Sequence, residues 1–546
     1  MSMFETTESA SVSGVAGEAY PRSWPGAAVA TASPDATLAA AYVLGVGGNA
    51  VDAAVAAAWA LAVCEPSASG LGGQAVALVH FGGQTRVFDG HSFAPAGLDP
   101  DHLTKQQQRS GYAAGTIPSM PATLDALQSR FGRLNRHTVM SAAIVLAEAG
   151  YRLSPLQARQ IRWTAGALRT SGVGDCFLHH GQPLPAGSLI RQPALARTLR
   201  RLADAGIRDF YEGQIAARIA ADMAARGGLI RARDLASFAA PLESEPFSFH
   251  YRGHLIRTAA PPGGGLQLGL ALKVLEEMDG LDSCDETSWL AAVAFAIYTA
   301  FLERDGAPLP VAQWPKVSEL RDLSPASVSK AIAAALRALG GGAPVDPLGG
   351  LEEPGDTTHL TVADKQGNVV GLTLSIQSVF GAKVASPELG FFYNNYLRTC
   401  PRTAHPQRLA PGCRPRSNAL PAMVFDPTAP FPGPRMSLGS AGSRRIVSSV
   451  LQVLSRVVDR GSGLRDAVAA PRIHALLSRK LWVERPAATP ELIERLGARF
   501  AEIIVKPRLC YSMAAVHAIG VDRQGQLESA ADPRRDGDIY MENEND

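Results

Sequence analysis

The 546-residue chain carries a formal net charge of +2, and 46% of its residues are hydrophobic while 19% are charged. This balance is typical of a globular protein of one large or two to three ordinary domains, and the scattered basic residues argue against a nucleic-acid partner. Residues 1–26 lack the basic and apolar segments of a signal peptide, and the longest apolar run, from Ala53 to Cys64, is too short to span a bilayer. We therefore expect a cytoplasmic protein without a membrane partner, in which residues 1–26 form a flexible arm.

Periodicity predicts mainly helices in the first two thirds of the chain. Residues 36–64 predict two Ala-rich, closely packed helices joined at Gly47-Gly48. Residues 75–90 predict a hairpin that turns at Gly82-Gly83, and residues 120–235 and 284–340 are mostly helical. The Gly- and Pro-rich residues 338–356 predict an exposed loop.

After this loop the pattern changes to strands. "HLTVAD" and "NVVGLTLSIQ" are rich in β-branched residues and flank the turn "KQGN". Residues 443–461 predict a helix that stops at Gly461, and residues 512–532 predict another hairpin. Strands interspersed with helix pairs indicate a layered α+β fold.

The six cysteines are widely spaced and form no C-x-x-C pair. This spacing argues against a zinc site or an essential disulfide framework, so we expect a reduced protein. We expect no metal and no cofactor.

Thr357 follows "EPGD" and opens the first strand of the predicted hairpin. The ordinary interpretation is that a loop ends and a strand begins. The functional interpretation is cleavage between Asp356 and Thr357, after which the released amine of Thr357 serves as the base for its own hydroxyl. That chemistry also requires hydroxyl and oxyanion donors that converge on Thr357.

The second strand of this hairpin has two distinct faces. Val370, Leu372, Leu374 and Ile376 share one face, whereas Thr373, Ser375 and Gln377 share the other. A three-residue loop at Gln366–Asn368 would place Thr357 opposite Gln377 and on the face of Ser375. A two-residue loop would place Thr357 on the opposite face, and the sequence leaves both registers open.

The segment "GSAGSRRIVSSVL", residues 439–451, is a Gly/Ser turn that enters a helix. The exposed amides at such a helix start can bind an anion or a transition-state oxyanion. An ordinary capped helix is the simpler interpretation.

Several motifs together resemble the γ-glutamyltranspeptidase family of N-terminal-nucleophile hydrolases, from about residue 27 to the carboxyl end. They are "GGNAVDAAVAAAWALAVCEPSASGLGGQ", "YEGQIAARIAADMAARGGLIRARDLASF", "APPGGGLQ", "DTTHLTVADKQGNVV", "FGAKVASPELGFFYNN" and "AADPRRDG". The resemblance implies a four-layer αββα sandwich, made as a precursor that cuts itself before Thr357. Residues 27–356 would then be the large-subunit region and residues 357–546 the small-subunit region of one intertwined domain, which forms a heterodimer of its own fragments.

The resemblance also implies roles for individual residues. Ser375 matches a family threonine that supports the nucleophile. Gly442 matches the first glycine of the oxyanion hole, and Ser443 stands where a second glycine is usual.

The substrate pocket departs from the family pattern. His91 replaces the arginine that holds the glutamyl carboxylate, so an always-charged fork becomes a titrating imidazole. Tyr396 and Thr399 stand where the family has acidic or amide side chains that grip the α-amino group. Ser417 and Asn418 stand at the serine pair that helps bind the carboxylate, and Gln377 replaces a family asparagine. Arg416, Arg444 and Arg445 are the candidates for a replacement cation.

Three functional hypotheses follow. The first is a self-processing amidohydrolase or acyltransferase that acts on a small amide other than a standard γ-glutamyl compound, with water as the expected acceptor. The second is a γ-glutamyltransferase or glutathione hydrolase with an altered pocket. The third is an unprocessed, non-catalytic relative.

Overall fold

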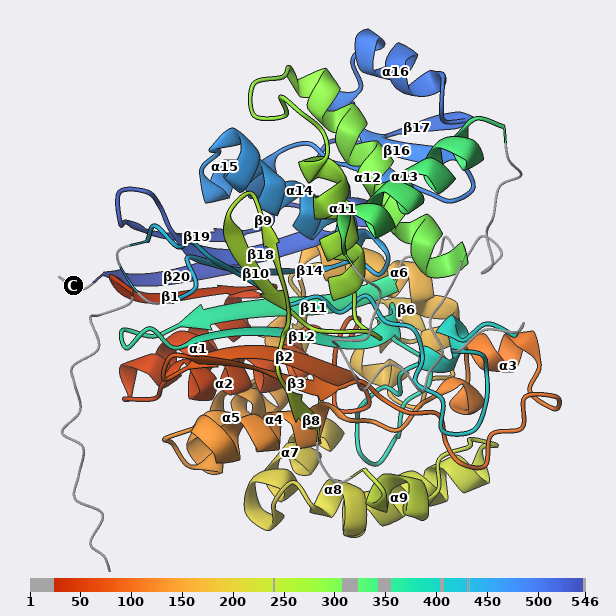
Figure 1. Ribbon diagram of the computed structural model, residues 1–546. Coiled ribbons are helices and arrows are strands. Elements are labelled where there is room, and N and C mark those ends of the chain that lie inside the picture. The colour runs from red at the N-terminus through yellow and green to blue at the C-terminus, as the bar shows by residue number, and fades with distance from the viewer. Residues whose placement is uncertain are drawn as a thin grey trace, which may run out of the picture.

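The computed structural model describes residues 24–238, 241–306, 323–341, 355–402, 407–429, 431 and 433–543. Two antiparallel sheets lie face to face, and helices cover the outer face of each sheet (Figure 1). The expected four-layer αββα sandwich is confirmed. Most of the long predicted loop, residues 342–354, lies outside the described residues, as do residues 1–23 of the predicted arm.

The first sheet has seven strands and mixes strands from both ends of the chain. Its order is β20 (Asp538–Asn543), β1 (Gly26–Thr31), β11 (Gly355–Ala363), β12 (Val369–Ser378), β2 (Gln74–Phe81), β3 (Gln84–Gly90) and β8 (Leu242–Ser244). The strand that contains Thr357 is therefore central, with β1 on one side and β12 on the other.

The second sheet has six strands and is also built from distant segments. Its order is β19 (Leu527–Ala531), β18 (Ala515–Val521), β14 (Met436–Ala441), β13 (Ala422–Phe425), β10 (His254–Thr258) and β9 (Phe247–Tyr251). A small core that includes Trp24, Ala28, Val76, Met423 and Ile519 lies between the two sheets.

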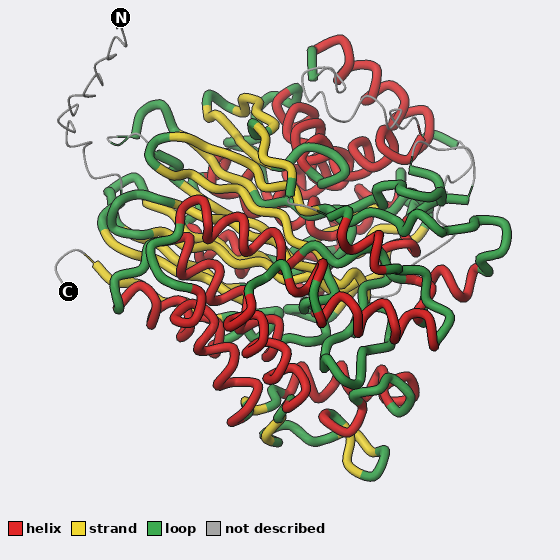
Figure 2. Tube along the Cα trace, turned by 90° about the horizontal axis from the view of Figure 1, so that it is seen from below, coloured by secondary structure: helices red, strands yellow, loops and turns green. Residues whose placement is uncertain are grey.

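Helices bury the outer face of each sheet against a separate apolar core. The outer face of the seven-stranded sheet is covered mainly by helices from the first half of the chain, which Figure 2 shows from below. They include α1 (Pro34–Gly45), α2 (Ala50–Cys64), α4 (Met120–Phe131), α5 (Arg136–Ala149), α6 (Pro155–Leu168) and α7 (Pro193–Ala205). The core over the six-stranded sheet contains residues of α11 (Gly265–Glu276), α12 (Glu286–Gly306), α13 (Pro325–Leu339), α14 (Arg445–Arg460), α15 (Leu464–Ala469) and α16 (Pro490–Gly497).

Local sequence signals explain most of these elements. Every residue of α2 is buried, which its small Ala side chains permit, and Asn49 and Asp52 form a capping box at its start. The helix α14 ends at Gly461, whose left-handed backbone conformation suits glycine. The predicted helix pair at 36–64 and the hairpins at 75–90 and 512–532 are confirmed.

The predicted exposed loop before Thr357 extends too far along the chain. Strand β11 begins at Gly355 and Asp356 is fully buried, so these residues belong to the sheet and not to an exposed loop. The turn is Lys365–Gly367, because Asp364 pairs with Asn368. Thr358 consequently pairs with Leu374. An irregularity between Asp356 and Thr358 then shifts the register, so Gln377 lies opposite Asp356 and not opposite Thr357.

The two ends of the described chain pair with each other. Gly26 in β1 lies opposite Asn543 in β20, and the buried Trp24 donates its indole N–H to the Pro434 carbonyl. The described structure therefore includes the last residues of the predicted arm. Across the described ranges, no helix combines the length and apolarity needed to cross a membrane.

Candidate active site

The irregular register of the β11–β12 hairpin brings the Thr357 and Ser375 hydroxyls together. Thr357 Oγ1 lies 3.0 Å from Ser375 Oγ and donates to the carbonyl oxygen of Asp356 at 2.8 Å. Ser375 Oγ donates to the same carbonyl at 3.1 Å and accepts from the Gln377 amide at 3.0 Å. Of the two arrangements that the sequence left open, the structure has the one that brings Thr357 and Ser375 together, and both hydroxyls converge on the peptide bond before Thr357.

A buried ion pair holds Asp356, the residue before this bond. Arg535 Nη1 donates to Asp356 Oδ1 at 2.5 Å and to the Thr357 carbonyl at 3.2 Å, while Gln160 Nε2 donates to Asp356 Oδ2 at 2.9 Å. Burial alone would lower the pKa of Arg535, but the Asp356 carboxylate raises it, so the guanidinium stays charged. The pair fixes both sides of the candidate scissile bond.

Glu65 is a second buried carboxyl group near this bond. Its pKa is raised to about 8, chiefly by burial and also by the Asp356 charge, while the Arg535 charge opposes the shift. Its Oε2 atom has no hydrogen-bond partner among the described residues. The raised pKa favours the protonated form of Glu65, which makes this carboxyl group a candidate proton donor near the bond.

The Gly442 and Ser443 amides lie beyond the end of β14 that faces Thr357. The Thr361 hydroxyl in β11 donates to the Ser437 hydroxyl in β14, on the facing sheet. Closer to Thr357, His359 lies against Gly439, so the two strands run in opposite directions and Thr357 lies toward the Ala441–Gly442 end of β14. Gly442 has φ +120° and a Cβ there would collide with Ala514, while Ser443 is left-handed at φ +59°. Among the described residues neither amide donates to a protein acceptor, as an oxyanion hole at the start of α14 requires.

His91 is held in a buried chain of charged groups. Its Nδ1 lies 2.6 Å from Asp89 Oδ1, and Arg414 donates to Asp89 Oδ2 at 2.7 Å. Burial raises the pKa of Asp89, but His91 and Arg414 together lower it well below its ordinary value, so Asp89 is ionised. His91 is 1% exposed and its Nε2 has no partner among the described residues, which leaves this atom for a ligand.

Tyr396 joins the nucleophile to the predicted carboxylate-binding residues. Burial raises the pKa of its phenol to about 12, although Ser375, Ser417 and Gln74 hydrogen-bond with it and oppose the shift. Gln74 Nε2 in turn donates to Ser417 Oγ at 3.3 Å, and Gln74 Oε1 accepts from Ser92. The neutral phenol thus occupies the position at which the resemblance puts the grip on an α-amino group.

The structure uses the other predicted pocket residues differently. Thr399 Oγ1 lies 2.9 Å from the carbonyl oxygens of Tyr396 and Arg416, so its hydroxyl braces the backbone. Gln377 has a left-handed backbone (φ +82°) and accepts from Ser378. Asn418 Oδ1 accepts from Arg304 Nη1 at 2.6 Å.

Arg304 is the cation that lies against the predicted carboxylate-binding pair. It comes from α12, 114 residues before Asn418, and no sequence signal links the two. Of the cations suggested from the sequence, Arg445 donates to the Ser512 carbonyl and Arg416 to the Thr399 carbonyl. No sequence signal singled out Arg535, Glu65, Asp89, Gln74 or Arg414, although the first two and Gln74 lie within the quoted motifs.

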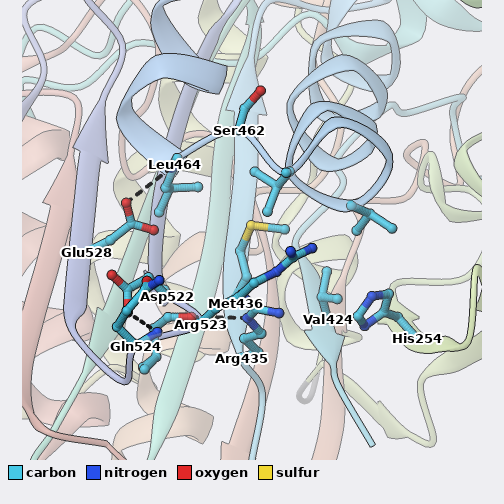
Figure 3. Close-up of a pocket in the computed structure, with 16 residues that line it drawn as sticks. His254, Val424, Arg435, Met436, Ser462, Leu464, Asp522, Arg523, Gln524 and Glu528 are labelled. Carbon is cyan, nitrogen blue, oxygen red and sulfur yellow. Dashed lines mark hydrogen bonds between the residues drawn. The ribbon is translucent and has the colours of Figure 1, made fainter. Parts of the chain in front are cut away.

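A cavity of about 380 Å³ lies elsewhere, at the other end of β14 and α14 (Figure 3). Its lining includes Arg435, Arg523, His254 and Glu528, and Glu528 accepts from the Leu464 amide. None of the predicted site residues lines it. We therefore place the candidate chemistry at Thr357 and not in this cavity.

Comparisons with known proteins agree with this geometry. The chain matches the family model described as Gamma-glutamyltranspeptidase over residues 36–541. It is 34% identical to the acylase ACY 1 proenzyme of Pseudomonas sp. (strain V22), covering 93% of this chain and 92% of that protein. It is 30% identical to the glutathione hydrolase proenzyme of Bacillus subtilis (strain 168), covering 93% and 90%.

The fold agrees with a solved structure of the same kind. The cephalosporin acylase from Bacillus halodurans superimposes with a TM-score of 0.83 at 24% identity, covering 98% of this chain and 99% of that one. At this identity the likeness establishes the fold, which is that of an N-terminal-nucleophile hydrolase.

Proposed function

This chain is an enzyme of the gamma-glutamyltranspeptidase family, whose members are self-processing amidohydrolases and acyltransferases, and we propose that it cuts itself between Asp356 and Thr357. The observation that carries the proposal is the 2.8 Å contact between Thr357 Oγ1 and the Asp356 carbonyl oxygen. The nucleophile lies beside the carbonyl group that it would attack, and Ser375 donates to the oxygen on which charge would develop.

Self-cleavage proceeds through an ester. Thr357 Oγ1 loses its proton and bonds to the Asp356 carbonyl carbon, the peptide C–N bond breaks, and the Thr357 nitrogen leaves as an amine after it gains a proton, so the shift consumes no net proton. Glu65, a carboxyl group near this bond whose pKa is raised by burial, is the candidate proton donor. Water then hydrolyses the ester and leaves Thr357 as a free amino terminus.

The processed enzyme repeats this chemistry on its substrate. The Thr357 amine takes the proton of its own hydroxyl, which attacks the acyl carbon of an amide. The amides of Gly442 and Ser443 stabilise the oxyanion, and the acyl group passes from Thr357 to water or to an amine. The fragments 27–356 and 357–546 remain associated, because β11 pairs with β1 from the first fragment and β12 pairs with β2.

We infer that the substrate is a small amide other than a standard γ-glutamyl compound. The phenol of Tyr396 and the backbone-bonded hydroxyl of Thr399 replace groups that would hold an α-amino cation, and neither carries a negative charge. His91 offers one neutral or cationic nitrogen where a bidentate guanidinium is usual. Lost charge-assisted hydrogen bonds of about 1.5–3 kcal/mol each lower specificity for γ-glutamyl groups.

Arg304 supports a second candidate, a γ-glutamyltransferase or glutathione hydrolase with an altered pocket. Its guanidinium contacts Asn418, one of the pair at which the resemblance puts the substrate carboxylate. A cation there can bind a carboxylate without the usual arginine. The glutathione hydrolase relatives agree with this candidate, whereas the acylase relatives agree with the first.

Intact mass of the purified protein tests the cleavage. We expect two fragments, the smaller starting at Thr357 with about a third of the 57.4 kDa mass, while Thr357→Ala stays intact. A single uncut wild-type chain after long incubation would favour the non-catalytic hypothesis. Comparing turnover of γ-glutamyl anilides with that of uncharged acyl anilides then separates the two candidate substrates.

A further inference from the structure

Cys400 and Cys413 face each other in the segment that borders the candidate pocket. Their sulfur atoms are 3.7 Å apart, and the two side chains are 3% and 8% exposed. The two cysteines are 13 residues apart in the sequence, so no short cysteine motif predicts the contact. Cys64 differs, because its thiol donates to the Ser33 hydroxyl and not to another cysteine.

The two thiols have unequal acidity. The hydrogen bond from Cys400 lowers the pKa of Cys413, whereas the same hydrogen bond and burial raise that of Cys400 well above its ordinary value. Cys413 also follows the exposed Pro411 and Gly412, so it is the member nearer to solvent. A low-pKa thiol beside a second thiol is the arrangement of a pair that oxidises through one attacking sulfur.

The pair lies where two pocket-bearing segments meet. Thr399 Oγ1 contacts the Arg416 carbonyl, and Arg416 Nε donates to the Thr399 carbonyl at 3.2 Å. Tyr396 precedes Cys400, and Arg414, which holds the Asp89 carboxylate, follows Cys413. A bond between the sulfurs would therefore tie together the segments that carry Tyr396 and Arg414.

The surroundings favour a disulfide over a metal site. Both cysteines pack in a small apolar cluster with Leu397, Leu409 and Leu103. Nowhere in the described part of the chain do three or more His, Cys, Asp or Glu side chains gather as metal ligands. An apolar dithiol without further ligands lacks the four donors that a structural zinc ion takes.

We propose that Cys400 and Cys413 form a reversible disulfide that fixes the border of the pocket. A small disulfide such as oxidised glutathione is the oxidant. The Cys413 thiolate attacks one of its sulfurs, the S–S bond breaks, and the expelled thiolate takes up the Cys400 proton. The Cys400 thiolate then attacks the Cys413 sulfur and expels the second glutathione thiolate, so two protein thiols are oxidised and one disulfide is reduced to two thiols.

Differential alkylation of the wild-type protein tests bond formation. The protein is equilibrated with reduced or oxidised glutathione, quenched in acid, denatured, alkylated and digested. We expect Cys400 and Cys413 to be alkylated after reduction and joined in one non-alkylated peptide pair after oxidation, while Cys64 is alkylated in both. Alkylation of both cysteines at every glutathione ratio would overturn the proposal.

Variants separate the disulfide from general effects of oxidation. Oxidation should raise the Tm of the wild type by a few degrees (~2–4 °C) and slow proteolysis of the 400–413 segment at least ~5-fold. Cys413→Ser should abolish both changes and Cys64→Ser should keep them; equal responses in the two variants would refute the assignment.

The effect on the pocket rests on the proposed function, but formation of the bond does not. The same alkylation and melting experiments on Thr357→Ala require no cleavage and no substrate, so they fail only if the disulfide is wrong. In the active enzyme we expect oxidation to change KM at least ~3-fold with little change in kcat, because the bond orders Tyr396 and Arg414 and leaves Thr357 untouched. An unchanged KM in a fully oxidised enzyme would contradict the link to the pocket.

Discussion

Replacement of Ser375 by alanine is expected to slow self-cleavage by about 10²–10³-fold. The Ser375 hydroxyl donates to the Asp356 carbonyl at 3.1 Å and lies 3.0 Å from the nucleophile Thr357 Oγ1. In the uncut chain this is one neutral hydrogen bond, worth only about 0.5–1.5 kcal/mol. When Thr357 attacks, the carbonyl oxygen gains negative charge, and loss of a donor aimed at such an oxygen costs about 2.7–4 kcal/mol of activation free energy.

The measurement is the rate at which intact precursor disappears, followed by mass spectrometry after rapid purification. Ser378→Ala is a matched control, because Ser378 is a buried serine of the same strand whose hydroxyl donates to Gln377 and not to Asp356. Ser375→Thr keeps the hydroxyl and should cleave within ~10-fold of the wild type. A Ser375→Ala precursor that cleaves as fast as Ser378→Ala would show that this hydroxyl does not stabilise the reaction, and our account of the site would be wrong.

Three further predictions address the surrounding charges. Arg535→Gln in the uncleavable Thr357→Ala background should lower the free energy of unfolding by about 3–5 kcal/mol, because it leaves the buried Asp356 carboxylate without its charged partner. Denaturant titration measures this free energy. As a control, Arg200→Gln removes one partner of an exposed ion pair and should lower it by at most ~1 kcal/mol. Arg304→Gln should raise KM about 10–100-fold for substrates with a carboxylate in the acyl group, and should change KM for uncharged acyl amides by less than ~3-fold. Equal changes in KM for both kinds of substrate would exclude Arg304 as a carboxylate receptor. Burial lowers the pKa of His517 to about 4 from its ordinary 6.5, so as pH falls the unfolded chain binds a proton before the folded chain does. The contribution of neutral His517 to the free energy of unfolding is therefore complete above pH 6.5 and falls by about 1.4 kcal/mol per pH unit down to pH 4. His517→Gln should therefore reduce the pH dependence of unfolding in that window, and an identical slope in both proteins would contradict the assignment.

The sequence predicts well those elements whose signal is local. Alanine-rich periodicity predicts α1 and α2, paired glycines predict the β2–β3 turn, and Gly461 ends α14 as expected. Each of these signals depends on a few neighbouring residues and survives tertiary packing. The alternation in β12 likewise places Leu372 and Leu374 in the core and turns Ser375 toward Thr357.

What the sequence does not predict are the contacts between distant segments. The hairpin register depends on an irregularity between Asp356 and Thr358. At this point the Asp356 carboxylate pairs with Arg535, which lies 179 residues away in the chain. Arg304 reaches Asn418 from another helix, and the cysteine contact spans a loop. Hydrophobic periodicity does not predict such pairs, because the packing of whole layers against one another decides which distant residues meet.

The layered architecture itself bears on why a threonine can serve as the nucleophile here. Thr357 is only 5% exposed in the uncut chain, in a strand between β1 and β12. The proposed cleavage would create an amino terminus that neighbouring strands hold in the sheet, and a buried amine favours its neutral, basic form. A neutral amine can take the proton of the adjacent hydroxyl, whereas a solvated and charged one cannot. The same burial that hides the bond before Thr357 would thus favour the neutral amine that the proposed mechanism requires as its base.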